Sequence, residues 1–130
     1  MTPASTPLRF LVVDDDEDMR EVLVRVVERM GHAVDQASDG AKAVEALARR
    51  SYDVMLLDLS MPRMTGEDVL RWLRRHPQSA AGVRVIVVSA WAESRVNALT
   101  ALGVDAVLPK PLLAEQLREL LEGRARSESA

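Results

Sequence analysis

Short apolar runs alternate along the chain with stretches in which apolar residues recur every three or four positions. Unbroken runs occupy residues 10–13, 54–57 and 106–108, a strong run interrupted only by Arg84 occupies residues 83–88, and a weaker, mixed run occupies residues 32–37. Continuous apolar runs of this length are typical of strands that are buried on both faces of a parallel sheet. The pattern therefore predicts five strands.

The stretches that follow these runs have the spacing of amphipathic helices. They cover residues 18–30, a segment that begins after the turn at 38–40, and residues 66–75, 94–102 and 112–122. The predicted inward-facing residues are Met19, Val22, Leu23, Val26, Val27 and Met30 in the first helix, and Leu113, Leu117, Leu120 and Leu121 in the last. A strand followed by a helix, repeated five times, indicates an α/β protein with a (βα)5 doubly wound parallel sheet covered on both faces.

The composition fits a single domain. The chain has 130 residues, of which 48% are hydrophobic, so it is long enough for one core and too apolar to be fully disordered. We expect a flexible leader at residues 1–8, a folded domain at 9–122 and a flexible tail at 123–130, because the two ends are rich in small and polar residues.

Several classes of protein are excluded at this stage. The chain has no cysteine, so disulfide scaffolds, thiolate metal sites and cysteine nucleophiles are ruled out. No apolar run approaches the roughly 18 residues of a membrane helix, and the first residues lack the features of a signal peptide. We therefore expect a cytoplasmic protein without a membrane partner. A net charge of −3 does not suggest direct binding to nucleic acid.

The residues with reactive or ligand-binding side chains lie directly after the predicted strands. Asp14 and Asp15 follow the first strand, Asp58 the third, Ser89 the fourth, and Lys110 the fifth. In a doubly wound sheet the ligand site lies beyond the carboxyl ends of the strands, where the strand order reverses. We therefore expect these side chains to meet at one edge of the sheet.

Three carboxylates in one small site repel one another, and a hard divalent cation relieves that repulsion. Oxygen ligands with retained water suit Mg²⁺, whereas no histidine lies at a strand end to favour zinc. A metal, an ammonium group and a hydroxyl group around one carboxylate make a site for phosphoryl transfer.

Each residue taken alone has a simpler interpretation. An acidic run after a strand is often the start of a helix, and this is the interpretation that we favour for Asp16, Glu17 and Asp18. A serine such as Ser89 often caps a helix or a turn, and Lys110 alone would be a surface lysine. The functional hypothesis depends on all of these residues occurring at the same position after their strands.

The sequence resembles the receiver domains of two-component response regulators over residues 8–122. The matching segments are residues 11–16, 58–66, 87–90, 103–105 and 108–111, which occur in the order and at the spacing of that family. Each segment alone is a modest match, and together they are specific. The resemblance implies a flavodoxin-like fold with strand order 2-1-3-4-5.

The resemblance also implies a role for each site residue. Asp58 would accept a phosphoryl group from a phosphohistidine of a sensor histidine kinase or a histidine phosphotransfer protein. Asp15, Asp58 and the main-chain carbonyl of Ser60 would bind Mg²⁺ directly, and Asp14 would act mostly through water.

Three further residues complete the implied site. Ser89 and Lys110 would each bind an oxygen of the phosphoryl group, and the small Ala90 would leave room for the incoming phosphohistidine. The protein would signal to a downstream partner by a change of conformation. A homodimer through the face of helix 4, strand 5 and helix 5 is a further partner that the resemblance allows.

The sequence departs from the family pattern in the fifth strand and shortly after it. Val107 replaces the usual aromatic residue, which puts the usual aromatic readout in doubt, and Leu112 replaces the frequent phenylalanine after Lys-Pro. Trp91, two residues after Ser89, is either a packing residue or a shield that slows hydrolysis of the phosphorylated aspartate. We expect ordinary surface roles for His32 and His76, which lie away from the strand ends.

Four alternatives remain open. The alternatives to a receiver domain that acts alone are a fragment of a longer multidomain regulator and a pseudo-receiver that binds partners without phosphate. The others are a phosphohydrolase with an aspartyl nucleophile and a nucleotide-binding protein. Such hydrolases place a second aspartate two residues after the nucleophile, where this chain has Ser60. A nucleotide-binding protein would need a glycine-rich loop after the first strand, where this chain has acidic residues.

Overall fold

The computed structural model describes residues 7–59, 61, 64–90, 98–110 and 112–129. Five parallel strands form one sheet in the order β2-β1-β3-β4-β5, as the sequence predicts. The strands are β1 (Arg9–Val13), β2 (Ala33–Ala37), β3 (Val54–Leu57), β4 (Arg84–Ser89) and β5 (Ala106–Pro109). The order changes direction between β1 and β3, so this is the point at which a ligand site is expected.

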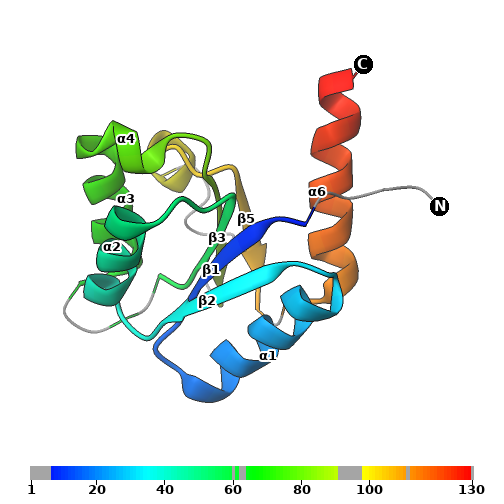
Figure 1. Ribbon diagram of the computed structural model, residues 1–130, viewed down its shortest axis with the longest axis horizontal. Coiled ribbons are helices and arrows are strands. Elements are labelled where there is room, and N and C mark those ends of the chain that lie inside the picture. The colour runs from blue at the N-terminus through cyan, green and yellow to red at the C-terminus, as the bar shows by residue number, and fades with distance from the viewer. Residues whose placement is uncertain (1–6, 60, 62–63, 91–97, 111, 130) are drawn as a thin grey trace.

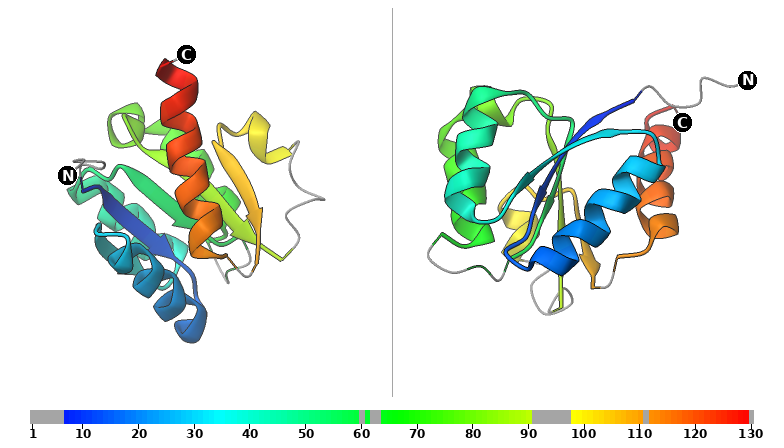
Figure 2. Two further views of the ribbon diagram at one scale, coloured as in Figure 1. Left: turned by 90° about the vertical axis from the view of Figure 1, so that its right-hand side faces the viewer. Right: turned by 60° about the horizontal axis from the view of Figure 1, so that its bottom comes forward.

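The helices lie on both faces of the sheet. They are α1 (Glu17–Arg29), α2 (Gly40–Arg49), α3 (Gly66–Arg75), α4 (Pro77–Ala80) and α6 (Ala114–Ser129), and residues 98–101 are also helical. Figures 1 and 2 show α1 and α6 on one face and α2, α3 and α4 on the other. This arrangement confirms the predicted doubly wound α/β fold.

Alternate residues of each strand enter one of two hydrophobic cores, because successive side chains of a strand point to opposite faces. In β1, Phe10 and Val12 pack with α1 and α6, whereas Leu11 and Val13 pack with α2 and α3. All four side chains are fully buried. Burial on both faces explains why the strands appear in the sequence as continuous apolar runs.

Two helices differ from their prediction. The short helix α4 was not expected, and proline at its first position suits a helix start because that position needs no amide donor. The last helix was predicted to end at Glu122, and α6 runs to Ser129. Arg124, Ala125 and Arg126 favour this extension because they are good helix formers, whereas Gly123 opposes it.

The predicted inward stripes are too wide at two positions. Val22 of α1 is 49% exposed and Leu113 is 58% exposed, so the prediction is wrong for both. In α1 the core contact is made by Leu23 and Val27, and Val22 lies to one side of them. Leu113 precedes the first residue of α6 and lies outside that helix, whereas Leu117 within it is fully buried.

Two aspartates join neighbouring strands at the N-terminal edge of the sheet, which is the edge opposite the strand ends discussed above. Asp53 accepts a hydrogen bond from the amide of Arg9 at 2.8 Å, and its own amide donates to the carbonyl of Arg9 at 2.8 Å. Asp105 likewise accepts from the amide of Val85 at 2.8 Å and donates to its carbonyl at 2.9 Å. These contacts fix the register of β1 with β3 and of β4 with β5.

His32 lies at the same edge and is buried, with 8% of its surface exposed, so the expected surface role is wrong. The amide of Leu8 donates to Nδ1 of His32 at 2.9 Å, and the ring stacks on Phe10 with centroids 5.1 Å apart. Burial lowers the pKa of His32, although the carboxylate of Asp53 opposes the shift. His76, by contrast, is exposed as expected.

Among the described residues, no helix has both the length and the apolar character needed to cross a membrane.

Candidate functional site

The loop after β1 places Asp14 inside the protein and Asp15 at its surface. The amide of Asp14 donates to the carbonyl of Ala37 at 3.2 Å, which continues the pairing of β1 with β2 beyond the strand. The carboxylate of Asp14 is completely buried, and its Oδ1 accepts a hydrogen bond from the amide of Asp16 at 2.9 Å. Asp16 in turn caps α1 by accepting from the amide of Met19 at 3.1 Å, as its interpretation as a helix start requires.

Asp58 follows β3 and is held against the end of β1. Its amide donates to the carbonyl of Val13 at 2.9 Å, and only 5% of its surface is exposed. The chain then returns close to this residue, because a Cβ atom on Gly66 would lie 2.6 Å from the carbonyl oxygen of Asp58. Glycine is therefore required at position 66 for α3 to begin so near the site.

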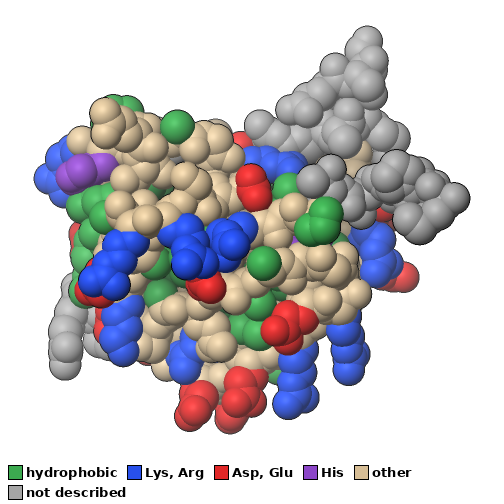
Figure 3. Space-filling model, in the orientation of Figure 1, with side chains coloured by type: hydrophobic (Ala, Val, Ile, Leu, Met, Phe, Trp, Pro, Cys, Tyr) green, Lys and Arg blue, Asp and Glu red, His purple; other side chains and the backbone are tan. Residues whose placement is uncertain are grey.

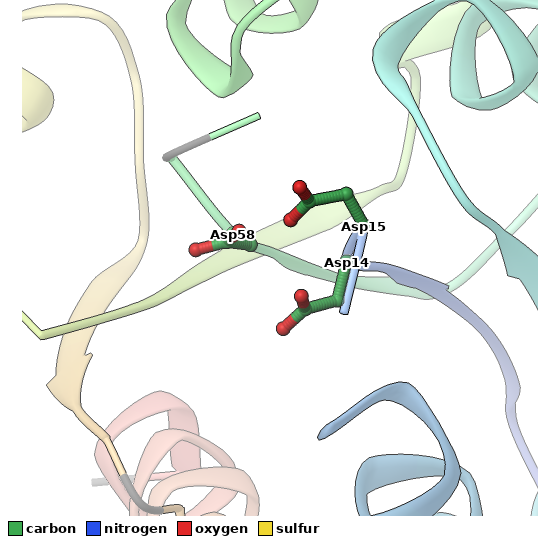
Figure 4. Close-up of side chains that lie close together, drawn as sticks. All are labelled: Asp14, Asp15 and Asp58. Atoms are coloured by element: carbon green, nitrogen blue, oxygen red, sulfur yellow. The ribbon is translucent and has the colours of Figure 1, made fainter. Parts of the chain in front are cut away.

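The carboxylates of Asp14, Asp15 and Asp58 converge at the C-terminal edge of the sheet. Each offers an oxygen atom, and these atoms all lie within 4.8 Å of one another. Figure 4 shows the three carboxylates turned to the same side of β1 and β3. In the space-filling view, acidic side chains also gather at the lower edge of the molecule, over the start of α1 (Figure 3). The geometry thus brings together the acidic residues that the sequence singled out.

Lys110 lies directly against this acidic group. Its Nζ atom is 3.2 Å from Oδ2 of Asp14 and 3.2 Å from Oδ1 of Asp58, and 21% of its side chain is exposed. Burial by itself lowers the pKa of Lys110, but the carboxylates of Asp58 and Asp14 outweigh that effect, so the pKa is raised overall. Lys110 is therefore a firmly charged partner of two buried carboxylates.

Ser89 lies beside Lys110 at the end of the neighbouring strand. The amide of Lys110 donates to the carbonyl of Ser89 at 3.2 Å, and the serine is 2% exposed. Ala90, the next residue, is exposed. Val107 of β5 pairs with Val87 of β4 and is partly buried against the core that includes α2 and α3. Ser60 and Trp91 lie outside the described residues.

The donor set fits a hard divalent cation such as Mg²⁺. The three candidate ligands supply carboxylate oxygens only, which are the ligands that Mg²⁺ prefers. Within the described part of the chain, Oδ2 of Asp14 is buried and accepts no hydrogen bond of good geometry, although Lys110 lies beside it as an ion-pair partner. A buried carboxylate oxygen with this unused capacity is consistent with a ligand shell that the cation completes.

Arg20, which was not among the predicted site residues, contacts the same loop. Its Nη1 atom donates to the carbonyl oxygen of Asp14 at 2.9 Å, and its Nε donates to Oε1 of Gln36 at 3.0 Å. Arg20 is in the first turns of α1, where its amide bonds to the carbonyl of Asp16. Its position four residues after the helix cap was the available signal, because a helical residue there can reach back to the preceding loop.

Comparison with known proteins points to one family. A family model for the response regulator receiver domain matches residues 10–122. The chain is 39% identical over 113 residues to the response regulator MprA of Mycobacterium sp. strain KMS. The match covers 85% of this chain and 47% of that relative, so the chain spans about half the length of the curated protein.

Solved structures give the same result. A sensor protein from Polaromonas sp. JS666 is 33% identical with a TM-score of 0.82, and the match covers 97% of this chain and 100% of the other. The response regulator TrrA of Thermotoga maritima, solved in complex with Mg²⁺-BeF, is 27% identical with a TM-score of 0.77. That match covers 89% of this chain and 97% of the other.

Proposed function

The chain belongs to the response regulator receiver domain family, and from this membership we propose that Asp58 accepts a phosphoryl group. The observation that carries the proposal is the surroundings of this carboxylate. Asp58 is 5% exposed, lies with Asp14 and Asp15 in one acidic group, and has the ammonium of Lys110 at 3.2 Å. A buried carboxylate next to a fixed positive charge is suited to receive an anionic group.

The transfer is a displacement at phosphorus. A carboxylate oxygen of Asp58 forms a bond to phosphorus while the bond between phosphorus and the imidazole nitrogen of the donor breaks, and the electron pair of that bond leaves with the imidazole. Lys110 balances charge on the phosphoryl oxygens, because its ammonium group already lies beside Oδ1 of Asp58. Ser89 would donate its hydroxyl proton in a hydrogen bond to another of those oxygens.

Mg²⁺ would be held by Asp15, by Asp58 and by the main-chain carbonyl of Ser60, with Asp14 acting mostly through water. When bound, the cation would neutralise negative charge on the phosphoryl oxygens. The support for this assignment is the all-oxygen donor set and the buried Oδ2 of Asp14. Receiver domains generally use this ion, and TrrA was solved with it.

We propose a sensor histidine kinase or a histidine phosphotransfer protein as the donor. Ala90 is exposed next to Ser89, and its small side chain would leave space for an approaching imidazole. The phosphorylated domain would then signal to a downstream protein, or pair with a second copy, through the face formed by residues 98–101, β5 and α6. Because Val107 replaces an aromatic residue in β5, this readout would not depend on a ring that swings inward.

The test is incubation of the protein with acetyl phosphate and Mg²⁺, followed by measurement of the intact mass. Wild type is expected to gain one phosphoryl group, and Asp58→Asn is expected to gain none. Asp18→Asn is the matched control, because Asp18 is an exposed aspartate in the first turn of α1. Equal modification of wild type and Asp58→Asn would show that Asp58 is not the acceptor. A wild type that gains no phosphoryl group would favour the pseudo-receiver alternative.

A further inference from the structure

Arg20 joins the acidic loop to the neighbouring strand through two separate hydrogen bonds. Nη1 donates to the main-chain carbonyl of Asp14 at 2.9 Å, and Nε donates to the side chain of Gln36, on β2, at 3.0 Å. We propose that Arg20 is a positioning residue that holds Asp15 in place to bind Mg²⁺. This inference rests on the proposed function of the site.

The positioning acts through the peptide bond between Asp14 and Asp15. The carbonyl group that Arg20 contacts belongs to this peptide, which is planar, so fixing the carbonyl also fixes the direction in which the chain enters Asp15. The amide of Asp14 is fixed separately by the carbonyl of Ala37. Asp14 is therefore held on both sides, whereas the exposed side chain of Asp15 depends on the backbone that carries it.

The guanidinium group suits this task because it offers donors in a rigid, planar arrangement. Nε is bound to Gln36, which orients the plane and directs Nη1 at the carbonyl of Asp14. A lysine at position 20 would carry the same charge on a flexible stem and could not make both bonds with fixed geometry. The proposal therefore concerns the shape of Arg20 and not only its charge.

Charge and position predict opposite effects on Mg²⁺ binding. Arg20 carries a positive charge beside a cation site, so a purely electrostatic role means that removing it strengthens the binding of Mg²⁺. If Arg20 positions the loop, its removal weakens binding, because Asp15 must then be ordered by the metal itself. Loss of a residue that orients a metal ligand typically lowers the affinity by about tenfold or more.

The experiment measures the dissociation constant of Mg²⁺ by calorimetry, without a phosphoryl donor. Arg20→Ala and Arg20→Lys are both expected to raise this constant by about tenfold. Arg25→Ala is the matched control, since Arg25 is an exposed arginine on the same helix, and it is expected to bind Mg²⁺ as wild type does. An unchanged or lower constant in Arg20→Ala, or wild-type affinity in Arg20→Lys, would overturn the proposal.

A third variant covers the case in which Arg20→Ala does not fold. Gln36→Ala keeps the arginine and its charge and removes only the partner of Nε, so a smaller rise in the dissociation constant is expected. Wild-type affinity in Gln36→Ala would likewise overturn the proposal, because the bond to Nε would then play no part in directing Nη1.

Failure of this inference can be distinguished from failure of the proposed function. A wild type that binds Mg²⁺ while the Arg20 variants are unaffected would overturn only the positioning role. A wild type that binds no Mg²⁺ would overturn the metal site and the positioning role with it. Phosphorylation of Asp58 is measured separately by mass.

Discussion

Replacing Lys110 with methionine removes the one ammonium group that the described structure places against the two buried carboxylates, while keeping a side chain of similar length. Nζ lies 3.2 Å from both Asp14 and Asp58, whose exposed fractions are 0% and 5%. In the variant these two carboxylates and Asp15 face one another without that positive charge. We expect the folded state to be destabilised in the absence of Mg²⁺.

The size of this effect has an upper limit. At an effective dielectric constant of about 20, a charge pair at 3.2 Å is worth roughly 5 kcal/mol before the desolvation of the ammonium is subtracted. A carboxylate that loses its partner can also take up a proton, which at pH 7 costs about 4 kcal/mol for a carboxyl group of ordinary acidity. The free energy of unfolding should therefore fall by about 2–4 kcal/mol at pH 7. Near pH 5 proton uptake costs only about 1.5 kcal/mol, so the difference from wild type should shrink.

The assay is urea unfolding of both proteins at the two pH values, without Mg²⁺ and again with it. Lys42→Met is the matched control, because Lys42 is the only other lysine and its Nζ contacts Ser38 on the exposed side of α2. Added Mg²⁺ should narrow the difference, since it brings positive charge to the same carboxylates. A loss of stability that is the same at both pH values, or absent at pH 7, would refute the electrostatic reasoning.

Two further predictions concern residues around the sheet. His32→Ala should lower the free energy of unfolding by about 2 kcal/mol near neutral pH, through loss of the bond from Leu8 and of the stack on Phe10. Because the pKa of His32 is lowered in the folded state, its contribution is present above pH about 6.5 and is lost as the pH falls, so urea unfolding should show the two proteins converging in acid. Gly66→Ala should lower both stability and the yield of phosphorylation by acetyl phosphate, because the new Cβ would lie 2.6 Å from the carbonyl oxygen of Asp58. Wild-type values in both measurements would contradict that close approach.

The parts of the fold that were predicted correctly follow from strong local patterns. Strands such as β3 are continuous apolar runs because they are buried on both faces, and α3 has the same bounds in the prediction and in the structure. The inward-facing residues of the helices were predicted less accurately. In α1, more apolar residues occur at helical spacing than are buried in the core. Val22 is exposed for this reason, although its type and spacing match those of the buried Leu23 and Val27.

The site could be anticipated because parallel strands end at the same edge of the sheet. That rule alone was enough to expect Lys110 near Asp14 and Asp58, which are far away in the sequence. Contacts that depend on where one long side chain turns could not be predicted in this way. Arg20 reaches a main-chain carbonyl, and the buried ring of His32 accepts a bond from a backbone amide. Residue types do not identify a main-chain partner, so the only sequence signal for Arg20 was its place four residues after the helix cap, and His32 had none.

The aspartates at the N-terminal edge of the sheet have a consequence for protein engineering. Asp53 and Asp105 align neighbouring strands at the end of the sheet that is farthest from Asp58. Segments after β1, β3, β4 and β5 can therefore be exchanged with those of a relative while the residues that set strand alignment stay unchanged. Chimeras built in this way would change the residues around the proposed phosphoryl acceptor while the contacts that align the strands stay the same.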